Sequence, residues 1–83
     1  MNEKVDREQL KKQVLAAMEL VIAVGETIRE LKQVPAGQLY AVTMGVLDLD
    51  QFERVIATLV KAGLVRREPS HLLVWVEPHP ELN

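Results

Sequence analysis

The chain has 83 residues, enough for one domain near the lower size limit at which a polypeptide builds its own core. Its composition, 48% hydrophobic and 27% charged residues, excludes an intrinsically disordered chain. The formal net charge of -2 lacks the basic surplus that nucleic-acid-binding domains usually carry, and the absence of cysteine excludes disulfides and thiolate metal ligands.

Neither a targeting segment nor a membrane span is expected. The first residues, MNEKVDREQLKKQ, mix both signs of charge, unlike a signal peptide. The most apolar run, residues 14–24, contains Glu19 and is far shorter than the roughly 20 apolar residues that cross a bilayer. We therefore expect a soluble, cytoplasmic protein that does not contact membranes.

A long first helix is predicted from about residue 6 to residue 32, where no proline interrupts a run of good helix formers. Apolar residues alternate spacings of four and three, which is a heptad seam. This seam contains Leu10, Val14, Ala17, Val21, Val24, Ile28 and Leu31. A second apolar stripe, Leu15, Met18 and Ile22, lies on roughly the opposite side.

A helix that is apolar nearly all round must be covered on more than one side. One interpretation is a dimer or higher oligomer, and its predicted interface contains Val14, Ala17, Val21, Val24, Ile28 and Leu31. The alternative is a single central helix wrapped by its own short domain. Gly25, inside the pattern, either permits close backbone approach or marks a bend.

Two shorter helices follow. Pro35 suits a helix start, so a helix is predicted over 36–44, burying Leu39 and Val42, with Gly45 after its end. Asp48 with Gln51 and Asp50 with Glu53 both have capping-box spacing, so the next helix is predicted over 50–62. Its buried stripe is Leu49, Phe52, Val55, Ile56, Leu59 and Val60, and its opposite face carries Gln51, Arg54, Thr58 and Lys61.

The last predicted element is a β-hairpin over 64–76, turning around Pro69 and Ser70. Residues 79–83 follow two prolines and are predicted to form a loose tail, which leaves 1–78 as a single domain. The predicted fold class is mainly α with a small antiparallel β-hairpin.

Helix, short helix, tight turn, helix and hairpin is an order that resembles the winged helix-turn-helix superfamily. Residues 34–77 carry the resemblance, and the stretch LVKAGLVRRE, residues 59–68, is its most specific part. The resemblance implies a winged helix-turn-helix preceded by a long N-terminal helix. A small α+β domain with the same elements packed differently is the alternative.

By this resemblance the helix over 50–62 would enter the major groove of double-stranded DNA. The implied DNA-binding residues are Gln51, Arg54, Thr58 and Lys61 on the helix, with Arg66, Arg67 and His71 on the wing. Asp48, Asp50, Glu53 and Glu68 depart from this pattern, because carboxylates there repel phosphates. The arginines and Lys61 have a second interpretation, as the solvated surface of a helix and a strand edge.

Two functions therefore stay open. The first is a small dimeric DNA-binding regulator of transcription, and the second is a winged-helix module for protein interaction or assembly. Acids interleaved with Arg54, Lys61, Arg66 and Arg67 would favour the second.

The sequence contains no set of residues that indicates catalytic activity. Ser70 is the only serine and lies in the predicted turn of the hairpin, the four glycines are scattered, and the sequence contains no phosphate-binding loop motif. His71, Glu77 and His79 meet no standard ligand spacing. No enzymatic activity, no cofactor and no metal site are expected.

Overall fold

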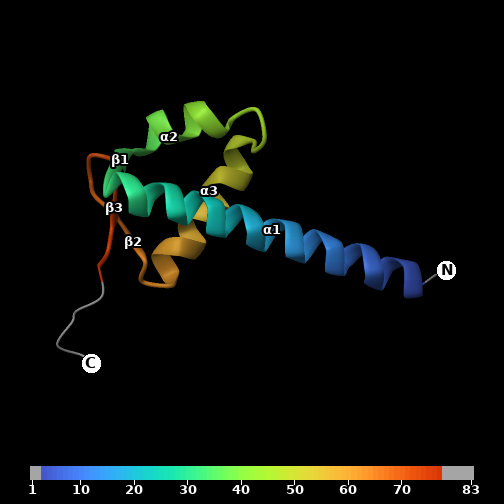
Figure 1. Cartoon of the computed structure of the whole chain (residues 1–83). Coiled ribbons are helices and arrows are strands. Elements are labelled where there is room, and N and C mark those ends of the chain that lie inside the picture. Colours follow the sequence, from blue (N-terminus) through green and yellow to red (C-terminus); the bar gives the residue numbers. More distant parts are fainter. Residues whose placement is uncertain (1–2, 78–83) are drawn as a thin grey trace, which may run out of the picture.

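The computed structural model describes residues 3–77 and shows a mainly helical chain with a small antiparallel sheet and a long N-terminal helix (Figure 1). This part of the predicted fold class is confirmed. The elements are α1 (Glu3–Leu31), β1 (Gln33–Pro35), α2 (Ala36–Thr43), α3 (Leu49–Lys61), β2 (Val65–Arg67) and β3 (Leu72–Trp75). The predicted tail over 79–83 lies outside the described residues. Among those described, no helix is both long and apolar enough to cross a membrane.

Both ends of α3 form for reasons visible in the sequence. Asp48 Oδ1 accepts a hydrogen bond from the Gln51 N–H at 2.8 Å, and Gln51 Oε1 accepts one from the Asp48 N–H at 3.0 Å. This capping box satisfies two backbone donors at the helix start. At the other end Gly63 adopts φ 80°, and the Leu64 N–H donates to the Leu59 carbonyl at 3.0 Å. That arrangement is a Schellman motif, which stops the helix.

The sheet has three strands, in the order β1-β3-β2, whereas the sequence predicted a hairpin alone. β1 pairs antiparallel with β3, placing Val34 opposite Leu73. Pro35 disfavours helical geometry for Val34 before it, but three residues are too few for a recognisable alternation. The strand forms because it satisfies the second edge of β3, which would otherwise leave backbone groups unpaired.

The core lies where α1, α2, α3 and the sheet meet. Its buried members are Val24, Ile28, Val34, Ala36, Leu39, Leu47, Phe52, Val55, Ile56, Leu59, Val65 and Leu73. Tyr40 is half-buried and packs edge-on against Phe52, with ring centroids 5.2 Å apart. The predicted burial of Val42, Leu49 and Val60 is wrong, since all three are exposed. α2 reaches the core through Ala36 and Leu39 in its first half, which leaves Val42 outside.

Only the C-terminal part of α1 belongs to this core. Its side chains from Arg7 to Glu19 are all exposed, Leu20 and Val21 are half-buried, and Val24 is the first buried one. Figure 1 shows the N-terminal half of α1 extending well beyond the other elements. A helix wrapped throughout by its own domain is therefore not what this chain forms.

Candidate functional site

The arginines predicted to contact DNA are paired with acids. Arg54 lies 2.9 Å from Asp50 one turn earlier on α3, and Arg66 lies 2.6 Å from Glu68. Both arginines and Asp50 are well exposed and Glu68 is partly exposed, so each pair is worth little to stability. They nevertheless place a carboxylate beside each cation, which lowers the attraction of this surface for phosphate.

Arg67 is held more tightly, by Glu53 of α3. Its Nη1 donates to Glu53 Oε1 at 2.7 Å and its Nη2 to Oε2 at 3.4 Å, while its Nε is buried without a hydrogen-bond partner. The hydrogen bonds from Arg67, helped by its charge, lower the pKa of Glu53, with partial burial opposing them. The same contact raises the pKa of Arg67. Arg67 thus joins β2 to α3.

The remaining residues of the predicted DNA-binding set are used in different ways. Gln51 is engaged in the capping box, and Thr58 Oγ1 donates to the Arg54 carbonyl of its own helix at 2.8 Å. Lys61 is exposed at the end of α3 and has no ion pair with the side chains described, those of residues 7–77. His71 is exposed in the turn between β2 and β3, where its φ is 66°.

A groove brings three of these residues together with α1. Gln51, Arg54 and Thr58 of α3 line it opposite three residues of α1, which are Ala17, Leu20 and Val21. An adjoining hollow, which shares Ala17, Val21 and Thr58, adds Val14, Met18 and Ile22. We call the two hollows together the α1–α3 groove. The structure therefore joins part of the predicted DNA-binding set to part of the predicted oligomer interface.

The predicted oligomer interface is only partly available. Val24 and Ile28 are 6% and 0% exposed, so they are occupied inside the subunit and cannot contact a second one. Leu31 is exposed but lies at the far end of α1 from the groove residues Val14, Ala17 and Val21. A heptad seam indicates burial but does not distinguish a partner chain from the helix's own domain.

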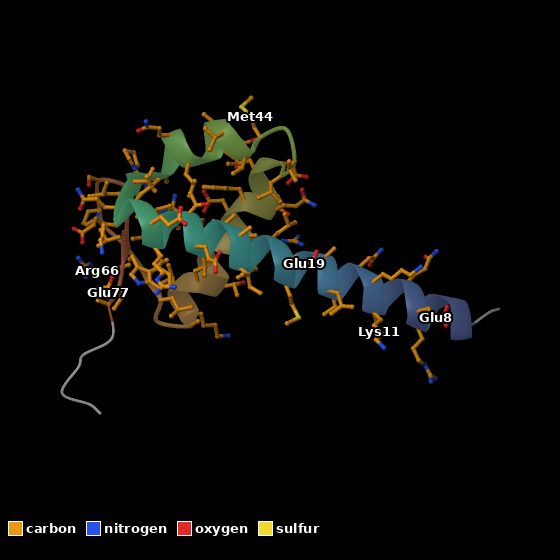
Figure 2. The ribbon with its side chains drawn as sticks, in the orientation of Figure 1. Glu8, Lys11, Glu19, Met44, Arg66 and Glu77 are labelled. Atoms are coloured by element: carbon orange, nitrogen blue, oxygen red, sulfur yellow. The ribbon has the colours of Figure 1, made fainter. Side chains whose placement is uncertain are left out.

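The interface prediction left out the second apolar stripe, although the sequence shows it. Leu15, Met18 and Ile22 are each more than half exposed, and two of them line the α1–α3 groove. Figure 2 shows Glu8, Lys11 and Glu19 along the same protruding part of the helix. This part of α1 thus carries apolar and charged side chains that the rest of the subunit does not cover.

The turn between α2 and α3 is a second exposed apolar surface. Val42 at the end of α2 is 76% exposed, and Met44 and Val46 in the turn are 61% and 73% exposed. This surface was not predicted from the sequence, because Val42 was expected to be buried in the core and nothing marked the turn as more than a connection.

The chain matches no protein-family model, and comparisons with curated proteins and with solved structures find no similar chain. Among the side chains that the structure describes, residues 7–77, no three of metal-ligating type come together, and His79 lies outside that range.

Proposed function

We propose that the protein is a winged-helix protein-interaction module that binds a helical segment in the α1–α3 groove, and that it does not read DNA. The observation that carries this proposal is the position of Gln51, Arg54 and Thr58. These residues form the face that a recognition helix would present to DNA, and here they line a groove against α1. A helix that reads bases must enter a major groove about 12 Å wide with that face free.

The shape of the α1–α3 groove suits a helix as its ligand. An amphipathic helix binds a groove by laying its apolar face against apolar walls. The walls here are mainly apolar, from Val14, Met18, Val21 and Ile22, and the charged side chain among the lining residues is Arg54, which pairs with Asp50. A bound helix would cover side chains that are otherwise exposed to water.

The order of elements supports the winged-helix assignment. α2 and α3 are joined by a five-residue turn, 44–48, that contains Gly45, and the strands β2 and β3 follow α3 as a hairpin. Two helices joined by a short turn with glycine are typical of a helix-turn-helix. The fold alone does not decide between a DNA ligand and a protein ligand.

Electrostatics favour the protein ligand. Each of the three candidate arginines lies within 3 Å of a carboxylate oxygen, and Asp48 stands at the start of α3. DNA binding remains the second candidate because Lys61 is exposed at the end of α3, next to the hairpin that carries Arg66. A single such cation supplies few of the 6–10 phosphate contacts typical of tight binders.

A titration with mixed duplex fragments at about 50 and about 200 mM salt tests the choice between them. We expect no saturable binding at either concentration. The double variant Asp50→Asn, Glu68→Gln is the positive control, because it frees Arg54 and Arg66 and should bind DNA more tightly than the wild type. Saturable wild-type binding that weakens steeply with salt, and weakens further in Lys61→Ala, would overturn the proposal.

A further inference from the structure

We infer that α1 of a second copy of this chain binds along Leu15, Met18 and Ile22, on the outer wall of the α1–α3 groove, running antiparallel, with Lys12 of each copy opposite the partner's Glu19. This inference rests on the proposed function, because it assumes that the groove binds a helix. It adds the identity, the direction and the register of that helix.

The exposed apolar surface has the size that a dimer of this kind needs. Leu10, Val14, Leu15, Met18 and Ile22 are each between 50% and 59% exposed. Five such side chains on one protruding helix form a patch of several hundred Å², which on a soluble protein marks an interaction site. A two-fold contact uses the patch twice. The total then approaches the roughly 1,000–1,200 Å² at which specific interfaces begin.

The exposed patch lies on one side of the protruding helix. At 3.6 residues per turn, Leu15, Met18 and Ile22 stack on one face of α1, with Val14 and Leu10 beside them towards the core side. Lys12 and Glu19 are seven residues apart and therefore share the opposite flank of this face. They are placed where charged residues border the apolar contact between two paired helices.

The charges along α1 favour the antiparallel direction. Residues 7–12 contain Arg7, Lys11 and Lys12 with one acid, Glu8, whereas residues 19–30 contain Glu19, Glu26 and Glu30 with one base, Arg29. In the stated register an antiparallel pair places residues 7–12 of each helix beside residues 19–24 of the other, where Glu19 is the one charged residue, whereas a parallel pair in register places Lys12 beside Lys12 and Glu19 beside Glu19.

Self-complementarity is the reason to choose a second copy over an unrelated helix. The exposed stripe of α1 has a basic stretch on its N-terminal side and Glu19 beyond its middle, so the stripe is complementary to itself when its direction is reversed. In a two-fold dimer Lys12 meets the partner's Glu19 twice, once on each side of the axis. One surface thus provides both halves of the contact.

The first test is the mass in solution by light scattering. We expect the wild type at micromolar concentration to have twice the 9.4 kDa mass of the chain, falling on dilution. Ile22→Glu should give the single-chain mass and keep the cooperative unfolding of the core, since this side chain is 58% exposed in the subunit and its replacement does not disturb the core. Val42→Glu is the matched control, being 76% exposed on α2 and away from the groove, and should keep the dimer.

The second test exchanges the charges of Lys12 and Glu19, and it determines the direction and the register of the paired helices. Lys12→Glu and Glu19→Lys should each weaken self-association about tenfold, because each places like charges together at two symmetric sites. An equimolar mixture of the two variants should recover wild-type affinity as a heterodimer.

A wild type that stays monomeric would overturn the dimer, and so would an Ile22→Glu variant that stays dimeric. A mixture that does not recover affinity would overturn the antiparallel register. The DNA titration separates these failures from failure of the proposed function. A monomer that binds no DNA contradicts this inference alone, and a monomer that binds DNA contradicts both.

Discussion

At the scale of single residues, the contact between Arg67 and Glu53 links elements that are distant in sequence. Fourteen residues separate the two, and the guanidinium spans both oxygens of the carboxylate at 2.7 and 3.4 Å. Such two-pronged pairs are more specific in geometry than the exposed ion pairs around them. The pair therefore fixes the hairpin against α3, and it withdraws one arginine from the surface available to a ligand.

We expect Glu53→Gln to lower the free energy of unfolding by about 1 kcal/mol near pH 7, a small effect because the Glu53 side chain is 45% exposed. The hydrogen bonds from Arg67 lower the pKa of Glu53 below its usual 4.5. The stabilisation is therefore fully present above that value and is lost as pH falls through the lower folded-state pKa. Urea unfolding of the wild type and of Glu53→Gln at about pH 7 and about pH 3 measures the difference between their free energies of unfolding. This difference should be smaller at the lower pH. An unchanged difference would show that the carboxylate charge is not involved.

At the scale of elements, α1 crosses α3 closely because Gly25 has no side chain there. A Cβ placed on Gly25 would lie 3.1 Å from Leu59 Cδ2. Of the two roles that the sequence left open for this glycine, close approach is the one the structure shows.

Gly25→Leu should destabilise the fold by about 1–3 kcal/mol, because the larger side chain pushes α1 away from α3. Gly25→Ala is the matched control and should be nearly neutral, since a gain of about 1 kcal/mol in helix propensity offsets the tight contact. Urea unfolding at one fixed protein concentration measures both. Adding Leu59→Ala to Gly25→Leu should cost less than the sum of the two single changes, and strict additivity would argue against the contact.

The sequence predicted the elements that local signals define. α3 was placed within one residue at each end because the Asp48 capping box and Gly63 both lie in the chain next to it. β1 was missed because its only cause is pairing with β3, almost 40 residues later. The same limit applies to the site. The pair of Arg54 and Asp50 is visible as a spacing of four, whereas the contact of Arg67 with Glu53 and the exposure of half of α1 depend on the packed fold.

At the scale of the whole molecule, the shape is extended for its size. The radius of gyration is 15.2 Å, against about 12 Å for a compact domain of this length. The principal extents of 50 × 35 × 20 Å reflect the half of α1 that leaves the body (Figure 1). An isolated helix of about 12–15 residues is marginally stable in water, so this half needs a cover to remain helical.

Amide hydrogen exchange can therefore show whether α1 is covered in solution. In the associated wild type we expect the amides of residues 10–22 to be protected, because the partner helix excludes water from this stretch. In Ile22→Glu the same amides should exchange rapidly, while those of residues 24–31, which face the core through Val24 and Ile28, stay protected in both proteins. The second region is thus an internal control for global unfolding. Rapid amide exchange over residues 10–22 in the wild type at every protein concentration would mean that no second copy of the chain covers this half of α1.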